Sequence, residues 1–235
     1  MTSLPSGVQP CSTPVATAAA IVAELRAQRN ERNIAGQRRF GITTTKCELL
    51  GVPAPVLRAI ARRHRRDHPL AAALWVHPLH EARAVAALAD DPRQVTRRQM
   101  ETWARDFDSW ALTDCCCTQL FNHTPFAVAQ AHVWSRRRAE FVKRAGFVLM
   151  AGLAVHAKQL PNAVFLAFLP VINREADDPR NFVKKAVNWA LRQIGKRNPV
   201  LRRAALAEAK RIFVRATPSA RWIAHDALRE LQHRD

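Results

Sequence analysis

The chain has 235 residues, which is enough for one large domain or two small ones with a continuous hydrophobic core. Lys and Arg total 37 against 19 Asp and Glu, and the resulting formal net charge of +18 favours a polyanionic partner, either nucleic acid or an anionic membrane surface. Because no uninterrupted apolar run reaches about 18 residues, we expect no membrane-spanning segment.

The N-terminal residues 1–14 carry no basic residue ahead of an apolar run, which argues against a secretory signal and favours a cytoplasmic protein. We expect these residues to form a flexible tail and residues 15–235 to form a single helical-repeat domain. Three of the five cysteines, Cys115, Cys116 and Cys117, are consecutive. Because three neighbours cannot all face one partner, we interpret them as buried reduced thiols rather than a disulfide framework.

Helices are the expected architecture along the whole chain. Only seven glycines occur, none in a Gly-x-Gly arrangement, and no β-branched run alternates with period two. Apolar residues instead recur at spacings of three and four, which predicts about a dozen helices. The predicted segments are residues 15–29, 55–66, 79–89, 92–105, 110–122, 126–134, 138–157, 162–172, 179–196, 199–215 and 218–231.

Prolines separate these segments, and their fixed φ suits the first turn of a helix. The short connections predict antiparallel helix hairpins. The sequence FVKRA at 141–145 recurs as FVKKA at 182–186, a displacement of 41 residues that is typical of stacked helix pairs. We therefore predict an all-α fold, a curved right-handed solenoid of antiparallel helix pairs with a concave basic groove. The prolines at expected helix starts are Pro69, Pro78, Pro92, Pro125, Pro161, Pro179, Pro199 and Pro218.

Trp110 and Asp114 are the first candidate site residues. They lie four apart, so on a helix that begins near Ser109 they share one face and place an indole beside a carboxylate. The alternative interpretation is that Trp110 packs in the core and Asp114 pairs with a nearby arginine.

A second group of candidates lies in the repeated segments. Arg144 and Lys185 occupy equivalent repeat positions, and Lys185 precedes Trp189 by one turn. Equivalent positions of a solenoid line one surface, so we expect these residues to meet Trp110 and Asp114 in one concavity. The alternative is that the basic side chains are simply solvated.

Further basic clusters suit phosphate contacts, although any one of them can be a solvated surface. They are Arg62-Arg63 with Arg65-Arg66, Arg97-Arg98, Arg136-Arg137-Arg138 and Arg202-Arg203. We expect no metal, because Pro78 separates His77 from His80 and no further ligands accompany them. The chain has neither a phosphate-binding Gly-x-x-x-x-Gly-Lys loop nor a Gly-x-Ser-x-Gly elbow, and we expect no cofactor.

Several longer stretches carry a family resemblance. They are GVPAPVLR at 51–58, Leu74-Trp75 followed by His80-Glu81, Ser109-Trp110 with Asp114, VKRA at 142–145, FVKKAVNWALR at 182–192 and KRNP at 196–199. From about Phe40 to the C-terminus, the chain resembles the AlkD-type DNA alkylation-repair glycosylases, which are built from HEAT-like helical repeats.

The resemblance implies a role for each matched residue. Asp114 would be the catalytic carboxylate, Arg144 its partner on the backbone phosphate, and Trp110 and Trp189 the indoles that contact the deoxyribose of the damaged nucleotide. The family also places a tyrosine near the lesion, whereas this chain has none, and Phe40 is the candidate replacement. The predicted DNA-binding residues are Lys143, Lys184, Lys185, Arg192, Arg136, Arg137 and Arg138.

The expected activity follows from the charge of the lesion. Alkylation at N3 of adenine or N7 of guanine leaves a cationic base that departs readily, so an ionised Asp114 needs only to stabilise the oxocarbenium-like sugar and position water. This predicts a monofunctional glycosylase that acts on alkylated double-stranded DNA as a monomer, in the cytoplasm at the nucleoid. The alternatives are a non-catalytic relative that binds damaged DNA and a helical scaffold for protein partners.

Overall fold

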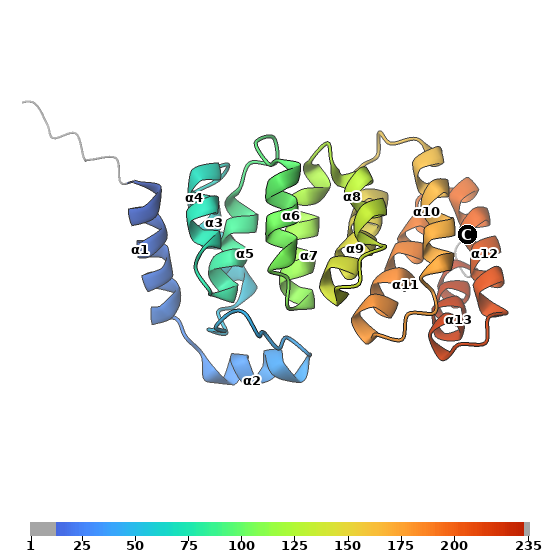
Figure 1. Cartoon of the computed structure of the whole chain (residues 1–235), viewed down its shortest axis with the longest axis horizontal. Helices are drawn as coiled ribbons and strands as arrows, with labels where there is room; N and C mark the ends of the chain where they lie inside the picture. The colour runs from blue at the N-terminus through green and yellow to red at the C-terminus, as the bar shows by residue number, and fades with distance from the viewer. Residues whose placement is uncertain (1–12, 233–235) are drawn as a thin grey trace, which may run out of the picture.

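The computed structural model describes residues 13–232, and within them the chain is helical, with one isolated β-bridge and no strand. Figure 1 shows the helices side by side in a curved row, in chain order from α1 to α12 and α13. The all-α class predicted from the sequence is confirmed. Of the predicted tail, all but Thr13 and Pro14 lie outside the described residues. Among residues 13–232, no helix combines the length and apolar character that crossing a bilayer requires.

The helices agree with most of the predicted segments. They are α1 (Pro14–Ala27), α2 (Glu31–Arg39), α3 (Ala54–Arg63), α4 (His68–Trp75), α5 (His80–Ala89), α6 (Arg97–Arg105), α7 (Trp110–Gln119), the 3-10 helix η1 (Phe121–His123), α8 (Ala127–Trp134), α9 (Glu140–His156), α10 (Asn162–Arg174), α11 (Asn181–Lys196), α12 (Pro199–Phe213) and α13 (Pro218–Gln232).

The sequence patterns miss two helices, α2 and α4. α2 is short and polar, and only Ile34 of its nine residues is buried, so it has no apolar stripe. α4 is apolar on nearly every side and therefore has no polar face to reveal its period. α6 begins at Arg97 rather than at residue 92, because the Thr96 hydroxyl accepts the Gln99 N–H at 3.1 Å and caps the helix there.

The core runs through the stack as one continuous cluster, from Ala18 in α1 to Leu231 in α13. The two helices that carry the repeated sequence, α9 and α11, pack directly against each other. The rings of Phe141 and Phe182, which are equivalent in the repeat, lie 5.6 Å apart. Each helix pair therefore buries its apolar surface against the next pair, as in other repeat proteins.

α2 departs from this stacking, and Figure 1 shows it lying crosswise to the row. Residues 40–53 return the chain from α2 to α3, and we call them the return loop. A carboxylate oxygen of Glu81 accepts the backbone N–H groups of Leu50 and Gly51 at 3.0 and 2.8 Å. The Asn30 N–H at the start of α2 donates to the Leu50 carbonyl at 2.8 Å. α5 therefore holds the return loop, and the return loop holds α2.

Gly51 is expected to be sensitive to substitution. Its φ is +72°, and an added Cβ would lie 2.5 Å from the carbonyl oxygen of Asn30. We expect Gly51→Ala to lower the free energy of unfolding by about 1–3 kcal/mol, measured by urea denaturation. Gly36→Ala within α2 is the control, because no heavy atom lies within 4 Å of its added Cβ, and it is expected to stabilise by about 0.5–1 kcal/mol. Similar effects of the two substitutions would contradict this account.

Candidate active site

The candidate site is built on the first turns of α7. The Ser109 side chain caps the helix by accepting the Leu112 N–H at 3.4 Å. From this start, residues 110, 114 and 118 follow at four-residue spacing and lie on one face of the helix. The Trp110 indole N–H donates to the Phe40 carbonyl at 3.0 Å, and Trp110 packs against a small apolar cluster that contains Ile34 and Ile42. The end of α2 therefore fixes the orientation of this indole.

Asp114 forms a two-point ion pair with Arg144 of α9. Nε and Nη2 of Arg144 donate to the two carboxylate oxygens at 2.8 and 2.7 Å, and Nη1 donates to the Phe182 carbonyl at 2.6 Å. Arg144 is 7% exposed. All three of its side-chain nitrogens therefore have acceptors within the protein. The alternative interpretation of Asp114, that it pairs with a nearby arginine, expected this arrangement. Arg144 orients the carboxylate directly, whereas a phosphate contact would need a rearrangement.

The charge of Asp114 depends on a balance between burial and this partner. Burial raises the pKa of Asp114, and the hydrogen bonds and positive charge of Arg144 oppose that rise without cancelling it. The neighbouring Cys115 behaves differently, because burial raises the pKa of its thiol to about 12 and keeps it neutral. Asp114 is therefore the acidic group whose ionisation the site controls.

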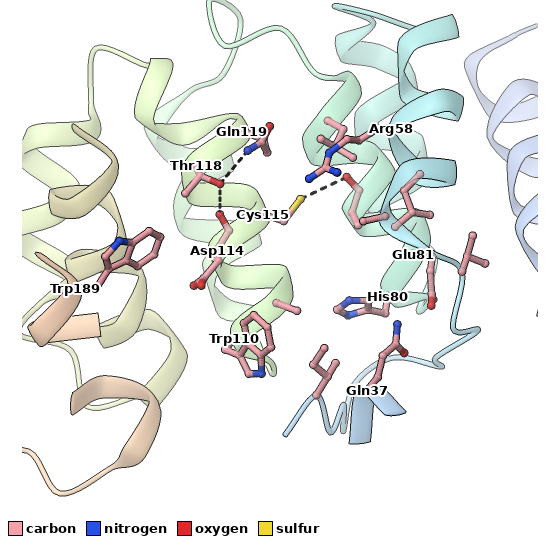
Figure 2. Close-up of a pocket in the computed structure, with 17 residues that line it drawn as sticks. Gln37, Arg58, His80, Glu81, Trp110, Asp114, Cys115, Thr118, Gln119 and Trp189 are labelled. Carbon is pink, nitrogen blue, oxygen red and sulfur yellow. Dashed lines mark hydrogen bonds between the residues drawn. The ribbon is translucent and has the colours of Figure 1, made fainter. Parts of the chain in front are cut away.

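A hollow of about 410 Å³ lies beside Asp114, between α7 and the helices that precede it. In Figure 2, Trp189 lies on one side of the α7 residues, while His80 and Gln37 lie on the other. We call this space the central hollow. Its lining side chains come from α2, the return loop, α3, α5, α7 and α11: Gln37, Ile42, Val52, Ala54, Leu57, Arg58, His80, Glu81, Ala84, Leu88, Trp110, Ala111, Asp114, Cys115, Thr118, Gln119 and Trp189.

The side of the central hollow away from Trp189 contains unpaired polar atoms. Within residues 13–232, Oε1 of Gln37, Nδ1 of His80 and Oε2 of Glu81 are buried and have no hydrogen-bond partner. Burial lowers the pKa of His80 and keeps its ring neutral. The two unpaired oxygens on this side are acceptors, and the exposed cation Arg58 lies on the same side.

The residues predicted around Asp114 come together only in part. Trp110, Asp114 and Trp189 line the central hollow, whereas Arg144 lies behind Asp114 and Lys185 is outside the lining. The expectation that Arg144 and Lys185 both face one concavity is therefore wrong, because Arg144 is buried against Asp114 and Lys185 is exposed outside the central hollow.

Four of the predicted DNA-binding cations have partners within the protein. Lys143 lies 2.5 Å from Glu175 and 3.2 Å from Asp178. Arg192 lies 2.5 Å from Glu230. The third, Lys184, packs its ammonium 5.0 Å from the centre of the Trp222 ring. The fourth, Arg137, lies 3.7 Å from Glu101. The side chains of Arg136, Arg138 and Lys185 are exposed and have no ion pair among the described residues.

Sequence reasoning missed two kinds of residue in the central hollow. Arg58 on α3 is exposed and lines it, with no acidic partner in the part of the chain that the structure describes. Arg58 is the last residue of the stretch 51–58 that carries the family resemblance, so the sequence did contain a signal for it. Gln37 lies on α2, which the patterns did not predict, so no signal pointed to it.

Comparisons with known proteins identify a family and a shared fold. A family model described as DNA alkylation repair enzyme matches residues 21–231. A solved structure described as "a new family of proteins related to the HEAT-like repeat DNA glycosylases with affinity for branched DNA structures" superposes with a TM-score of 0.73. The superposition covers 90% of this chain and 94% of that chain at 17% identity, so it shows the same fold. Among curated protein sequences there is no match.

Proposed function

Because the chain belongs to the family of DNA alkylation repair enzymes, we propose that it is a monofunctional DNA glycosylase for cationic alkylated purines in duplex DNA. The observation that carries the proposal is Asp114, a carboxylate oriented at two points by Arg144 in a hollow that Trp110 and Trp189 also line. Its substrates are bases of the 3-methyladenine and 7-methylguanine type. The enzyme acts as a monomer in the cytoplasm, on DNA of the nucleoid.

The proposed reaction hydrolyses the bond between the base and C1′ of the deoxyribose. The bond breaks with its electron pair going to the base, which neutralises the positive charge of the alkylated ring. Positive charge then develops on the sugar, where the carboxylate of Asp114 stabilises it electrostatically. The oxygen of a water molecule bonds to C1′ and its proton passes to Asp114 or to solvent. No general acid is required, because the base leaves as a neutral species.

The neighbouring side chains position the reactants for this step. Arg144 keeps Asp114 in one orientation and favours its ionised form. The indoles of Trp110 and Trp189 contact the deoxyribose. The exposed cation Arg58 on the opposite wall of the central hollow contacts a backbone phosphate. The net charge of +18 brings the polyanion to the groove.

The rate of excision is expected to depend on the ionisation of Asp114. Its raised pKa means that the ionised form is lost at a pH above the range in which an exposed aspartate protonates. We therefore expect single-turnover release of 7-methylguanine to fall as the pH drops through that raised pKa, after subtraction of spontaneous depurination. A rate that stays constant down to the ordinary carboxylate range would contradict this role.

Protonation of Asp114 does not itself destabilise the fold. With its pKa raised in the folded state, Asp114 binds its proton more tightly there than in the unfolded chain. Its contribution to stability therefore increases as the pH falls. Thermal unfolding measured at the same pH values separates the two effects.

The direct test is an excision assay on methylated duplex DNA, with released 3-methyladenine and 7-methylguanine quantified by chromatography. Release by the wild-type protein supports the proposal. The second candidate function is a non-catalytic binder of damaged or branched DNA. It is favoured by the complete pairing of Asp114 with Arg144 and by the affinity for branched DNA in the description of the similar structure. Binding without release, tighter to a four-way junction than to a duplex, would support the binder instead.

A further inference from the structure

The end of α2 presents an aromatic side chain to solvent at the edge of the central hollow. Phe40 is 77% exposed, although aromatic rings are usually buried. Its carbonyl accepts the Trp110 indole N–H, and its near neighbours Gln37 and Ile42 both line the central hollow. The ring is therefore held beside the candidate active site without being part of the core.

The backbone that carries this ring is fixed from two sides. Gly41 has a φ of +76°, and an added Cβ would lie 2.7 Å from Cζ of Phe182, so the chain passes in contact with α11. The Phe182 carbonyl accepts from Arg144, and Arg144 pairs with Asp114. Asp114 lies one turn from Trp110, whose indole returns to the Phe40 carbonyl. These contacts form a closed loop, which fixes the position of the Phe40 backbone relative to Asp114.

Unpaired positive charge surrounds the exposed ring. Arg38 and Arg39 directly precede Phe40, and both are exposed with no ion pair in the portion of the chain that the structure describes. Arg32, six residues before Arg38 on α2, is likewise exposed and unpaired there. The one acidic residue of the helix, Glu31, pairs with Arg29 at 2.6 Å. Arginines at the C-terminal end of a helix stabilise its dipole, but that effect gives no reason for an exposed phenylalanine.

We infer that the end of α2 is a DNA wedge, in which Phe40 inserts between base pairs next to the lesion while Arg38 and Arg39 bind the flanking phosphates. The inference rests on the proposed function, because it takes duplex DNA as the ligand of the groove. Positive charge without acidic partners selects a polyanion over an apolar protein surface. Proteins that bend DNA use apolar side chains in this manner, unstacking one base step and widening access to it. Here the opened step lies beside Asp114, where C1′ of the damaged nucleotide must be reached.

The test measures unstacking directly on the full-length protein, with DNA that cannot be cleaved. A duplex carries a tetrahydrofuran abasic analogue and a 2-aminopurine beside it, and the fluorescence of 2-aminopurine rises when it loses its stacking partner. We expect wild-type protein to raise the fluorescence and Phe40→Ala to abolish the rise. Loss of one aromatic stacking contact is expected to weaken binding by between about fivefold and a hundredfold. Phe40→Trp is expected to restore both signals.

Two controls make the result specific. Val214→Ala removes an even more exposed apolar side chain, 84% exposed at the end of α12, and is expected to match the wild type. In a separate variant, Arg38→Gln with Arg39→Gln is expected to weaken binding to every duplex and to reduce the salt slope by about 1.8, while saturating protein still unstacks the probe. Thermal unfolding of each variant verifies that it is folded.

The wedge is overturned if Phe40→Ala binds and unstacks the probe as the wild type does. The assay scores binding and unstacking without base release, so a lack of glycosylase activity does not affect it. Conversely, normal excision by Phe40→Ala would leave the proposed function intact while removing the wedge.

Discussion

Replacing Asp114 with asparagine is expected to lower the rate of 7-methylguanine release by about 10²- to 10³-fold, the effect of removing one preorganised electrostatic group. Asparagine keeps the size of the side chain and can still accept a hydrogen bond from Arg144, but it has no charge to stabilise the sugar cation. The measurement is single-turnover release from methylated duplex at a pH where the wild-type carboxylate is ionised. Unchanged release would remove Asp114 from the chemistry.

The same substitution affects stability, so it needs a matched control. Removing one partner of a buried ion pair costs about 3–5 kcal/mol, because the other charge stays buried without compensation. Asp226 on α13 provides the control. Its side chain is 18% exposed against 20% for Asp114, and it also pairs with arginines, Arg192 at 3.4 Å and Arg229 at 2.6 Å. Asp226→Asn is expected to destabilise the fold without the large loss of rate, since Asp226 does not line the central hollow.

Replacing Arg144 with alanine is expected to act through Asp114. Arg144 is the group that opposes the effect of burial on the pKa of Asp114, so its removal raises that pKa further. The acid limb, the part of the pH profile in which the excision rate falls as the pH drops, then moves to higher pH. Excision near neutral pH falls as a result. The free energy of unfolding is expected to fall by about 3–5 kcal/mol, measured by urea denaturation. An acid limb at the wild-type position would show that Arg144 does not tune Asp114.

Arg180 offers a control with the same bonding pattern. Its Nε and Nη2 donate to the two carboxylate oxygens of Asp178 at 2.9 and 2.6 Å, and its Nη1 donates to the Arg138 carbonyl at 2.6 Å. Arg180→Ala therefore removes an equivalent set of bonds away from the central hollow and is expected to leave the pH profile unchanged. A phosphate role for Arg144 predicts a different result, a uniform loss of affinity for all duplexes with no shift of the acid limb.

The sequence predicts the fold well where amphipathic periodicity is strong. α11 has a clear apolar stripe, whereas α9 is buried on nearly every side from Arg144 to Ala154. The two helices share a repeated motif, and their contact follows from the solenoid principle. α2 lies crosswise and buries only Ile34, so its position depends on distant hydrogen bonds from Glu81 through the return loop. Contacts of this kind leave no periodic signal in the sequence.

The sequence predicts the residues at the centre of the candidate site but not those at its edges. Four-residue spacing placed Trp110 and Asp114 together, and the repeat indicated Arg144. The pairing of Lys143 with Glu175, 32 residues away, could not be inferred, because spacing reveals partners on one helix and not on neighbouring ones. For the same reason, a cluster of basic residues does not reveal which of its members remain free to bind phosphate.

The contact of Gly41 with Phe182 has a mechanical consequence. In most solenoids each repeat touches only its neighbours, and the arc can open or close like a spring. Here Gly41 of the return loop contacts Phe182 of α11, so the segment that follows α2 acts as a tie that limits how far the arc can open. Under the proposed function, we expect a groove restrained in this way to resist spreading around a straight duplex, so that the DNA deforms to enter it. Smooth bending of a short site costs on the order of 1–6 kcal/mol. Steps that are already weakened by a lesion deform with less energy, which gives a restrained groove a means of selecting damaged DNA before any base is recognised.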